Sequence, residues 1–225
     1  MADYDLAVVG GGSAGYHAAR VASNQGKSVA LIEGAERFGG LCILRGCTPT
    51  KTMLRSAEIA QLVRESSELG IETSAPVINW PRIVQRTADL VTEFADYRHD
   101  SARGLEHVDI IRDWATFDSP DTIRLSDRTL TADHYVIATG SAPRTPGTES
   151  GAHPPGLEET GYLTSDDIPL LPELPDSLIV FGGGAVALEF AQLFCRLGIK
   201  VTVIQRSPLI LSNMDADIAV ALTRY

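Results

Sequence analysis

The stretch Leu6-Ala7-Val8-Val9-Gly10-Gly11-Gly12-Ser13-Ala14-Gly15 decides the fold of this 225-residue chain. A short apolar run leads into the spacing G-x-G-x-x-G, which predicts a buried strand, a tight turn and a helix. Gly10 permits the turn, Gly12 lets a pyrophosphate approach the backbone, and Gly15 lets the helix pack closely on the strand. The motif therefore predicts a dinucleotide site at a helix N-terminus, whose amides and positive end suit phosphates.

The residues that follow extend this unit. Val29-Ala30-Leu31-Ile32 predicts a second buried strand, and Glu33 ends it where an acidic side chain accepts hydrogen bonds from an adenosine ribose. Helices are predicted over 49–69 and from about residue 79. Short β-rich pieces are predicted around 109–111, 115–117 and 122–125, and a buried strand over 135–138.

A second unit of the same kind begins at Leu178-Ile179-Val180-Phe181 and closes with a strand over 200–204. Its glycine turn, with Gly182, Gly184 and Ala187, is the alanine-ended form of the fingerprint. Gln205 occupies the position where the fingerprint usually has an acidic residue, and its neutral amide lacks the charge that strengthens a hydrogen bond to ribose. Arg206 follows it, and an arginine there suits a 2′-phosphate. The second site is therefore predicted to prefer NADPH over NADH, although Arg206 could equally be a solvated charge.

Two strand–helix–strand units with intervening glycines predict an α/β fold with doubly wound parallel sheets. We expect a dinucleotide-binding domain over residues 1–150, with a small β insertion, and the first part of a second such domain over 177–225. Residues 151–176 lie in a stretch rich in proline, glycine and acidic residues, and are predicted to be a linker.

The composition excludes several function classes. The formal net charge is −10 and the chain has no Lys/Arg cluster, which argues against nucleic-acid and anionic-membrane partners. The acidic N-terminus runs directly into a predicted strand without a secretory signal, and the apolar stretches are too short to span a bilayer. With three cysteines, the chain is not a disulfide scaffold, and we expect a soluble cytoplasmic protein.

Two of those cysteines, Cys42 and Cys47, follow the first unit closely. A bridge across so short a loop would add little stability, so the pair indicates a redox-active dithiol beside a bound dinucleotide. Thr48 and Pro49 are typical of an N-cap and first helical residue, which would place Cys47 just before a positive helix end that favours the thiolate. Metal ligation or inert packing are the alternatives, but a zinc site needs a second ligand pair, and no metal site is predicted. Cys195 is interpreted as a buried packing thiol.

The motifs together resemble the class I pyridine nucleotide–disulfide oxidoreductases, the family of dihydrolipoamide dehydrogenase, mercuric reductase and glutathione reductase. The resemblance rests on the two glycine fingerprints and on the redox segment Cys42-Ile43-Leu44-Arg45-Gly46-Cys47-Thr48-Pro49-Thr50-Lys51 between them. It also rests on Ala138-Thr139-Gly140, which looks like the second flavin-binding motif of that family.

The resemblance implies a role for each matching residue. FAD would bind at Gly10, Gly12, Gly15, Glu33, Thr139 and Gly140, and the nicotinamide dinucleotide at Gly182, Gly184, Ala187 and Arg206. Cys47 would be the charge-transfer thiol and Cys42 the interchange thiol. Lys51 and Glu189 match an ion pair near the flavin and nicotinamide, although both could simply be surface charges.

The same resemblance implies an FAD-dependent NAD(P)H:disulfide oxidoreductase whose substrate is a small disulfide or dithiol, or a metal ion, and a homodimer for the full-length protein. The alternative is a truncated flavin-binding fragment or redox-sensing module without turnover, because members of the family run well beyond residue 225. Trp80 and Trp114 are interpreted as core or capping aromatics and not as ligand platforms.

Overall fold

A computed structural model describes residues 2–145 and 155–224, so that part of the predicted linker lies outside the described residues. By its internal contacts the chain divides into two compact units. Unit 1 comprises Met1–Thr48 and Asp89–Ala152, and unit 2 comprises Pro49–Ala88 and His153–Tyr225. This division assigns residues 49–88 to the second unit. It does not test the predicted functional domains, which stay a prediction.

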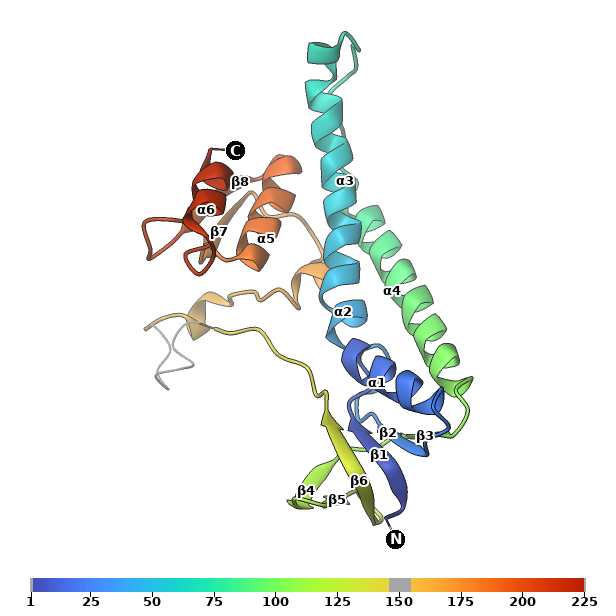
Figure 1. The fold of residues 1–225 in the computed structure, drawn as a ribbon. Helices are drawn as coiled ribbons and strands as arrows, with labels where there is room; N and C mark the ends of the chain where they lie inside the picture. Colours follow the sequence, from blue (N-terminus) through green and yellow to red (C-terminus); the bar gives the residue numbers. More distant parts are fainter. Residues whose placement is uncertain (1, 146–154, 225) are drawn as a thin grey trace. The chain divides into compact units, whose positions relative to one another are not determined.

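Unit 1 is built on a six-stranded sheet with the order β3-β2-β1-β6-β5-β4 (Figure 1). The first four of these strands run parallel, whereas β5 pairs antiparallel with β6 and β4 pairs antiparallel with β5. The predicted α/β fold with a mainly parallel, Rossmann-like sheet is confirmed. The strands are β1 (Tyr4–Val9), β2 (Val29–Ile32), β3 (Val108–Ile111), β4 (Thr116–Ser119), β5 (Thr122–Arg124) and β6 (Thr129–Ile137).

Side chains of β1 and β2 are buried on both faces of this sheet. Ala7 and Val9 join one hydrophobic cluster, with residues of β5 and β6, while Val8 and Leu31 join a second cluster on the other face. This alternation follows from the two-residue period of a strand. It explains why β2 is a continuous apolar run, as strands of parallel sheets covered on both faces are.

Helices cover the second of these faces. The helix α1 (Ser13–Ser23) packs its buried residues Tyr16 and Ala19 into that cluster, and Ala102 near the end of α4 (Trp80–Arg103) joins them. The Arg98 guanidinium lies 4.4 Å from the centre of the Tyr16 ring, a cation–π contact between the two helices. This packing holds α1 with its N-terminus at the glycine turn.

Unit 2 has its own parallel sheet of β7 (Ser177–Phe181) and β8 (Lys200–Ile204), connected by α5 (Ala185–Arg196). Its core joins Met53 and Ala57 of α3 (Cys47–Glu65) to Phe194 of α5. Trp80 is only 3% exposed, and its indole nitrogen donates to Leu171 O at 2.8 Å. The interpretation of Trp80 as a core aromatic is confirmed.

Several elements differ from their predictions. Strand β6 is longer than the stretch 135–138, and Ile137, predicted to be buried, is 69% exposed. The short helices α2 (Gly40–Leu44), α6 (Ala216–Thr223), η1 (Ser66–Leu69), η2 (Glu158–Thr160) and η3 (Ile168–Leu170) were not predicted separately. Within the predicted linker, Ile168 is buried in the core of unit 2, so this part of the stretch packs as core.

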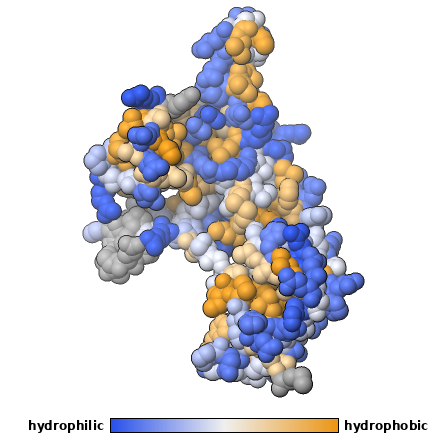
Figure 2. Space-filling model, viewed as in Figure 1, coloured by the Kyte–Doolittle hydropathy of each residue, from blue (hydrophilic) through white to orange (hydrophobic). Residues whose placement is uncertain are grey.

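The β7–β8 sheet leaves part of its apolar surface exposed among the described residues. Phe181 is 64% exposed, and Ile179 and Ile204 are also exposed. Figure 2 shows apolar surface over the part of the chain that holds β7, β8 and α6. Two strands and one connecting helix are too few to cover both faces of a sheet.

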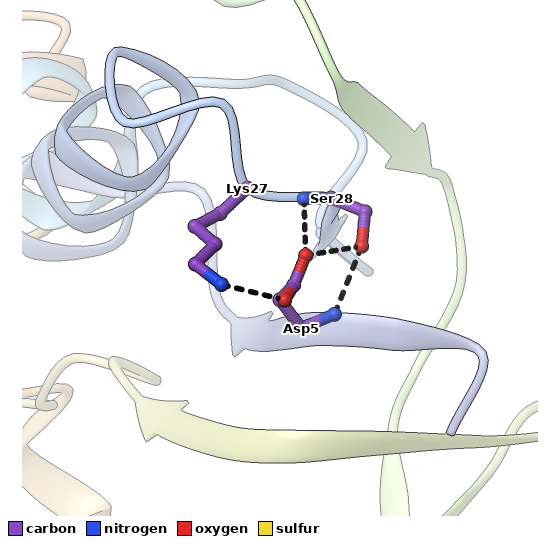
Figure 3. A network of polar contacts seen from close by, with 3 residues as sticks. All are labelled: Asp5, Lys27 and Ser28. Carbon is purple, nitrogen blue, oxygen red and sulfur yellow. Dashed lines mark hydrogen bonds and ion pairs between the residues drawn. The ribbon is translucent and has the colours of Figure 1, made fainter. Parts of the chain in front are cut away.

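Asp5 fastens the start of β1 to the turn before β2 (Figure 3). Its carboxylate accepts from Lys27 Nζ at 3.0 Å and from the Ser28 backbone N–H and hydroxyl, each at 2.8 Å. The hydrogen bond from Lys27, with those from Ser28, lowers the pKa of Asp5 from 3.8 to about 2. The network lies directly before the start of β2, and Glu33 directly follows the end of that strand.

We expect Asp5→Asn to weaken the acid sensitivity of this chain. A carboxyl whose pKa is depressed by folding stabilises the fold above its unfolded pKa of about 3.9, and that stabilisation is lost as the pH falls towards 2. The melting temperature of the parent should therefore exceed that of the variant at pH 5, and the difference should shrink between pH 4 and pH 2. Thermal unfolding followed by circular dichroism measures this, with Asp133→Asn, at an exposed site on β6, as the control. An equal gap at all pH values would contradict the prediction.

Candidate functional site

The first glycine turn is a place where three backbone segments converge. Gly10 has a φ of +105°, and a Cβ built there would lie 2.3 Å from Ala138 O. A Cβ on Gly15 would lie 1.8 Å from Gly10 O, whereas one on Gly12 would meet only Gly40 Cα, at 3.4 Å. Gly10 and Gly15 are thus required by packing, and Gly12 leaves open space beside the backbone.

Glu33 lies next to this turn at the end of β2. One carboxylate oxygen accepts from Gly11 N at 2.9 Å, and the other accepts from Ala35 N at 2.9 Å. The residue is buried, so the two bonds compensate the desolvation of its charge. The structure thus brings the predicted ribose acceptor to the glycine turn, and its role in binding stays a prediction.

The pair Thr139-Gly140 closes on the same turn from β6. Ala138 N donates to Val9 O at 2.8 Å, which extends the β1–β6 pairing to the turn. Thr139 Cα lies 3.3 Å from where a Cβ of Gly10 would stand. Gly140 has a φ of +80°, which L side chains rarely adopt. These residues therefore line the edge of the sheet that holds the glycine turn.

The two predicted redox cysteines also lie at this turn. The helix α2, which carries Cys42, approaches so closely that a Cβ on Gly40 would stand 2.5 Å from Gly12 Cα. Polar contacts with Cys47 and with the Ser13 side chain act on the Cys42 thiol. Both cysteines are free thiols in this structure, with Cys47 exposed and Cys42 half-buried.

The surroundings of Cys42 change its acidity. The hydrogen bond to Cys47, burial and the nearby charge of Cys47 raise the pKa of the Cys42 thiol above its ordinary value, and the bond from Ser13 partly offsets this. The Cys42 thiol therefore keeps its proton to a higher pH than an ordinary cysteine does.

The start of α3 differs from the prediction. The helix begins at Cys47 itself, so Thr48 is not its N-cap and Pro49 is the third helical residue. Proline is tolerated there because the first N–H groups of a helix have no intrahelical partner. Cys47 is thus part of the first helical turn, close to the positive end that the sequence predicted.

The second glycine turn, in unit 2, repeats the first. Gly182 has a φ of +106°, and its N–H donates to Ile204 O at 2.8 Å. Apart from its chain neighbours, no described residue has an atom within 4 Å of a Cβ built on Gly182 or Gly184, and Ala187 lies in the first turn of α5. The turn therefore leaves its backbone open towards a ligand.

At the end of β8, the position of the ribose acceptor is filled differently from Glu33. The Gln205 amide donates to Leu209 O at 2.6 Å and lies against Gly183. Arg206 is exposed beside it. A carboxylate is therefore replaced here by a neutral amide that is already bonded, followed by a cation.

Lys51 and Glu189, also in unit 2, form the ion pair that the sequence suggested, between Lys51 Nζ and Glu189 Oε1. The pair is not buried, because the two side chains are 58% and 37% exposed. Exposed ion pairs contribute about 0–1 kcal/mol to stability. The pairing therefore gives these residues a defined geometry and adds little to the fold.

The structure corrects two interpretations of single side chains. Cys195 is exposed, because it follows the fully buried Phe194 on α5 and thus lies about 100° further around the helix. Trp114 is not a core aromatic, because it is 76% exposed and belongs to no hydrophobic cluster of the described residues, but its indole caps Gly34. Ser13 and Gly40 were not predicted as site residues; the signal for Ser13 is its place inside the fingerprint.

Comparison with known proteins accounts for this arrangement. A family model described as pyridine nucleotide-disulphide oxidoreductase matches residues 4–225. The chain belongs to that family. It is 34% identical over 222 residues to a mercuric reductase of Bacillus cereus, covering 99% of this chain and 34% of that protein. It is also 34% identical over 236 residues to a dihydrolipoyl dehydrogenase of Chlorobaculum parvum, covering 99% of this chain and 47% of that protein.

A solved structure agrees with the family. The Cu(II) complex of the HOCl-induced flavoprotein disulfide reductase RclA from Escherichia coli superimposes with a TM-score of 0.75 at 28% identity. The match covers 97% of this chain and 46% of that one. The chain therefore spans between about a third and a half of the length of these relatives of the oxidoreductase family.

The described residues contain no group of three or more His, Cys, Asp or Glu side chains arranged to hold a metal ion. Each helix among them is too short or too polar to traverse a bilayer.

We expect substitutions of Cys47 and of Ser13 to shift the pH dependence of Cys42 alkylation in opposite directions. Cys47→Ala removes the acceptor and the charge that raise the pKa of Cys42, so alkylation of Cys42 should reach its plateau at lower pH. Ser13→Ala removes a donor that lowers this pKa, so the same profile should move to higher pH. The measurement is the rate of iodoacetamide labelling of the Cys42 peptide by mass spectrometry, in a Cys195→Ser background. Superimposable profiles for the parent and both variants would contradict the hydrogen-bond pattern.

Proposed function

We propose that this chain forms the flavin-binding portion, and part of the nicotinamide-binding portion, of an FAD-dependent NAD(P)H:disulfide oxidoreductase similar to dihydrolipoamide dehydrogenase. The observation that carries the proposal is the close approach of Gly40 to Gly12, which brings α2 and its Cys42 to the dinucleotide fingerprint. FAD, when bound, supplies two-electron transfer between a nicotinamide and a disulfide. Family membership of the chain supports this reaction class.

The residues of the first turn fit an FAD. The N-cap of α1 is Gly12, and no side chain caps the free amides of the helix, which are the donors that a pyrophosphate accepts from. The Glu33 carboxylate offers about four acceptor sites and uses two on backbone amides, which leaves sites for two ribose hydroxyls. Thr139 and Gly140 border the same turn.

The dithiol would serve as the electron acceptor. Reduction of a Cys42–Cys47 disulfide takes up two electrons and two protons and yields the two thiols. Cys47 would be the charge-transfer thiol and Cys42 the interchange thiol, as the family resemblance implies. A disulfide or dithiol, or a metal ion, would be the substrate.

The second turn would bind the nicotinamide dinucleotide. The N-cap of α5, Gly184, has no side-chain cap either, so the amides at the start of α5 are available to a second pyrophosphate. Gln205 is bonded to Leu209 O and carries no charge, and the exposed Arg206 suits a 2′-phosphate. We therefore propose NADPH in preference to NADH. The Lys51–Glu189 pair would hold its charges in place near the reacting rings.

Assembly and location belong to the proposal as well. The relatives are two to three times as long as the matched part, so turnover, substrate recognition and a homodimer are proposed for a full-length protein. A net charge of −10 and the lack of a basic cluster support a cytoplasmic enzyme that does not act on nucleic acid or membranes.

Anaerobic reduction of the FAD-loaded chain tests the placement of the dithiol. We expect two-electron reduction to produce a long-wavelength absorption band from contact between the Cys47 thiolate and the oxidised flavin. The band should vanish in Cys47→Ser and persist in Cys195→Ser, the control at an exposed cysteine outside the pair. FAD-loaded, folded protein that shows no band would overturn the proposed role of the pair.

The same preparation separates the enzyme from the alternative of a redox-sensing module. NADPH-dependent reduction of lipoamide, glutathione disulfide or mercuric ion by the chain would exclude a module without turnover. A band that forms without any such turnover would favour the module for this stretch.

Two glycine substitutions test the assignment of the two dinucleotides. Gly12 and Gly184 have ordinary negative φ values and room for a methyl group, so alanine at either position should leave the melting temperature within a few degrees of the parent. A Cβ there would nevertheless stand where a pyrophosphate approaches, so Gly12→Ala should weaken FAD and Gly184→Ala should weaken NADPH, each at least tenfold. Equilibrium dialysis against each nucleotide measures this. Loss of both nucleotides in either variant would contradict separate sites.

A further inference from the structure

Trp114 has an unusual environment for a large aromatic side chain. It is 76% exposed, yet its indole lies flat enough on Gly34 that a Cβ there would stand 2.5–2.8 Å from three ring carbons. Gly34 directly follows Glu33. One side of the indole therefore covers the backbone next to Glu33, and the rest of the ring is open to solvent.

Hydrogen bonds hold the segment that carries Trp114. The Asp113 carboxylate accepts from Ser126 N at 2.8 Å and Ser126 Oγ at 2.5 Å, and its other oxygen accepts from Trp114 N at 2.7 Å. The hydrogen bonds from Ser126 lower the pKa of Asp113. The carboxylate is therefore charged at neutral pH and continues to accept these hydrogen bonds. Trp114 is thus an exposed ring on an anchored backbone.

A second set of bonds ties this segment to the residues after β2. Arg112 Nη2 donates to Ala35 O and to Glu36 O, the latter at 2.8 Å. The strands β2 and β3 are neighbours in the sheet, and Glu33 N donates to Ile111 O at 2.9 Å. The backbone that carries Trp114 is therefore held at the edge of the sheet next to Glu33.

We infer that Trp114 forms the stacking surface for the adenine of the dinucleotide at the first glycine turn. The inference rests on the proposed function, in which Glu33 accepts from the adenosine ribose. The base is attached to the ribose carbon next to the one that bears the 2′-hydroxyl, so a ribose held by Glu33 places the base within reach of residues 34 and 114. Stacking on an indole tolerates any base because every base has a π face. Trp114 would thus add affinity for the nucleoside half and would not select adenine over guanine.

Tryptophan fluorescence of the 225-residue chain tests this contact. The chain has two tryptophans, and Trp80 is buried in unit 2, so the difference between the parent and Trp114→Phe reports on Trp114. We expect ADP to quench the emission of Trp114 and to protect it from acrylamide. FMN, which lacks the adenosine, should do neither.

Affinity provides an independent measurement. Trp114→Ala should weaken ADP and FAD about 5- to 150-fold, the range that loss of one base–aromatic stack implies. Trp114→Phe keeps a ring and should bind within about threefold of the parent. FAD binding is followed through the polarisation of flavin emission, which does not depend on tryptophan. Thermal unfolding of both variants checks that this exposed position can change without loss of the fold.

The outcomes separate this inference from the proposed function. FAD that binds the parent and Trp114→Ala equally well, with Trp114 unprotected by ADP, would overturn the stacking role and leave the flavin site intact. A folded parent chain that binds no FAD would overturn the flavin site itself, and the stacking role with it. Selective weakening in Trp114→Ala with recovery in Trp114→Phe would support both.

Discussion

The site depends on the close approach of backbone segments at one edge of the larger sheet. Gly15 touches the carbonyl of Gly10, Gly10 touches the carbonyl of Ala138, and Gly40 lies against Gly12. A Cβ built on Gly15, Gly10 or Gly40 would stand 1.8, 2.3 or 2.5 Å, respectively, from the nearest backbone atom. No larger residue therefore fits at these positions without movement of the backbone. Three chain segments distant in sequence can therefore meet there, which is the condition for building a composite site.

This convergence places groups of different chemistry side by side. The close approach of Gly40 to Gly12 fixes the start of α2, and Cys42 follows two residues later, where the Ser13 side chain lowers the pKa of its thiol. On the other side of the turn, Glu33 bonds Gly11. Backbone amides suited to an anion, a carboxylate and a dithiol therefore lie together at one turn. The glycines, which lack side chains, leave the room that lets these groups approach one another. The chemistry of the thiols is then set by short polar contacts, since the pKa of Cys42 depends first on its bond to the neighbouring sulfur.

The sequence predicted the parts of the fold whose signal is local. An apolar run that leads to glycines defines β1, and the strand that ends at Glu33 follows the same rule. Five-residue α2 has too few turns for helical periodicity, so the helix that positions Cys42 was not predicted. The exposure of Ile137, Cys195 and Trp114 was predicted wrongly because apolar character does not tell which face of an element has a neighbour. Similarly, nothing in the composition around Gly34 indicates that an indole lies over it.

Comparison of the two glycine turns separates what the motif itself encodes from what the surroundings add. Gly10 and Gly182 have φ values of +105° and +106°, and each donates to the last residue of the adjacent strand, at 2.7 and 2.8 Å. The surroundings differ, because β6 runs beside β1 and crowds Gly10, whereas β7 has one strand neighbour among the described residues and a Cβ built on Gly182 would meet none of their atoms within 4 Å. The turn therefore keeps its shape with or without a third strand. Its conformation belongs to the strand–glycine–helix segment alone, which is why such a short motif can be identified in a sequence with no other information.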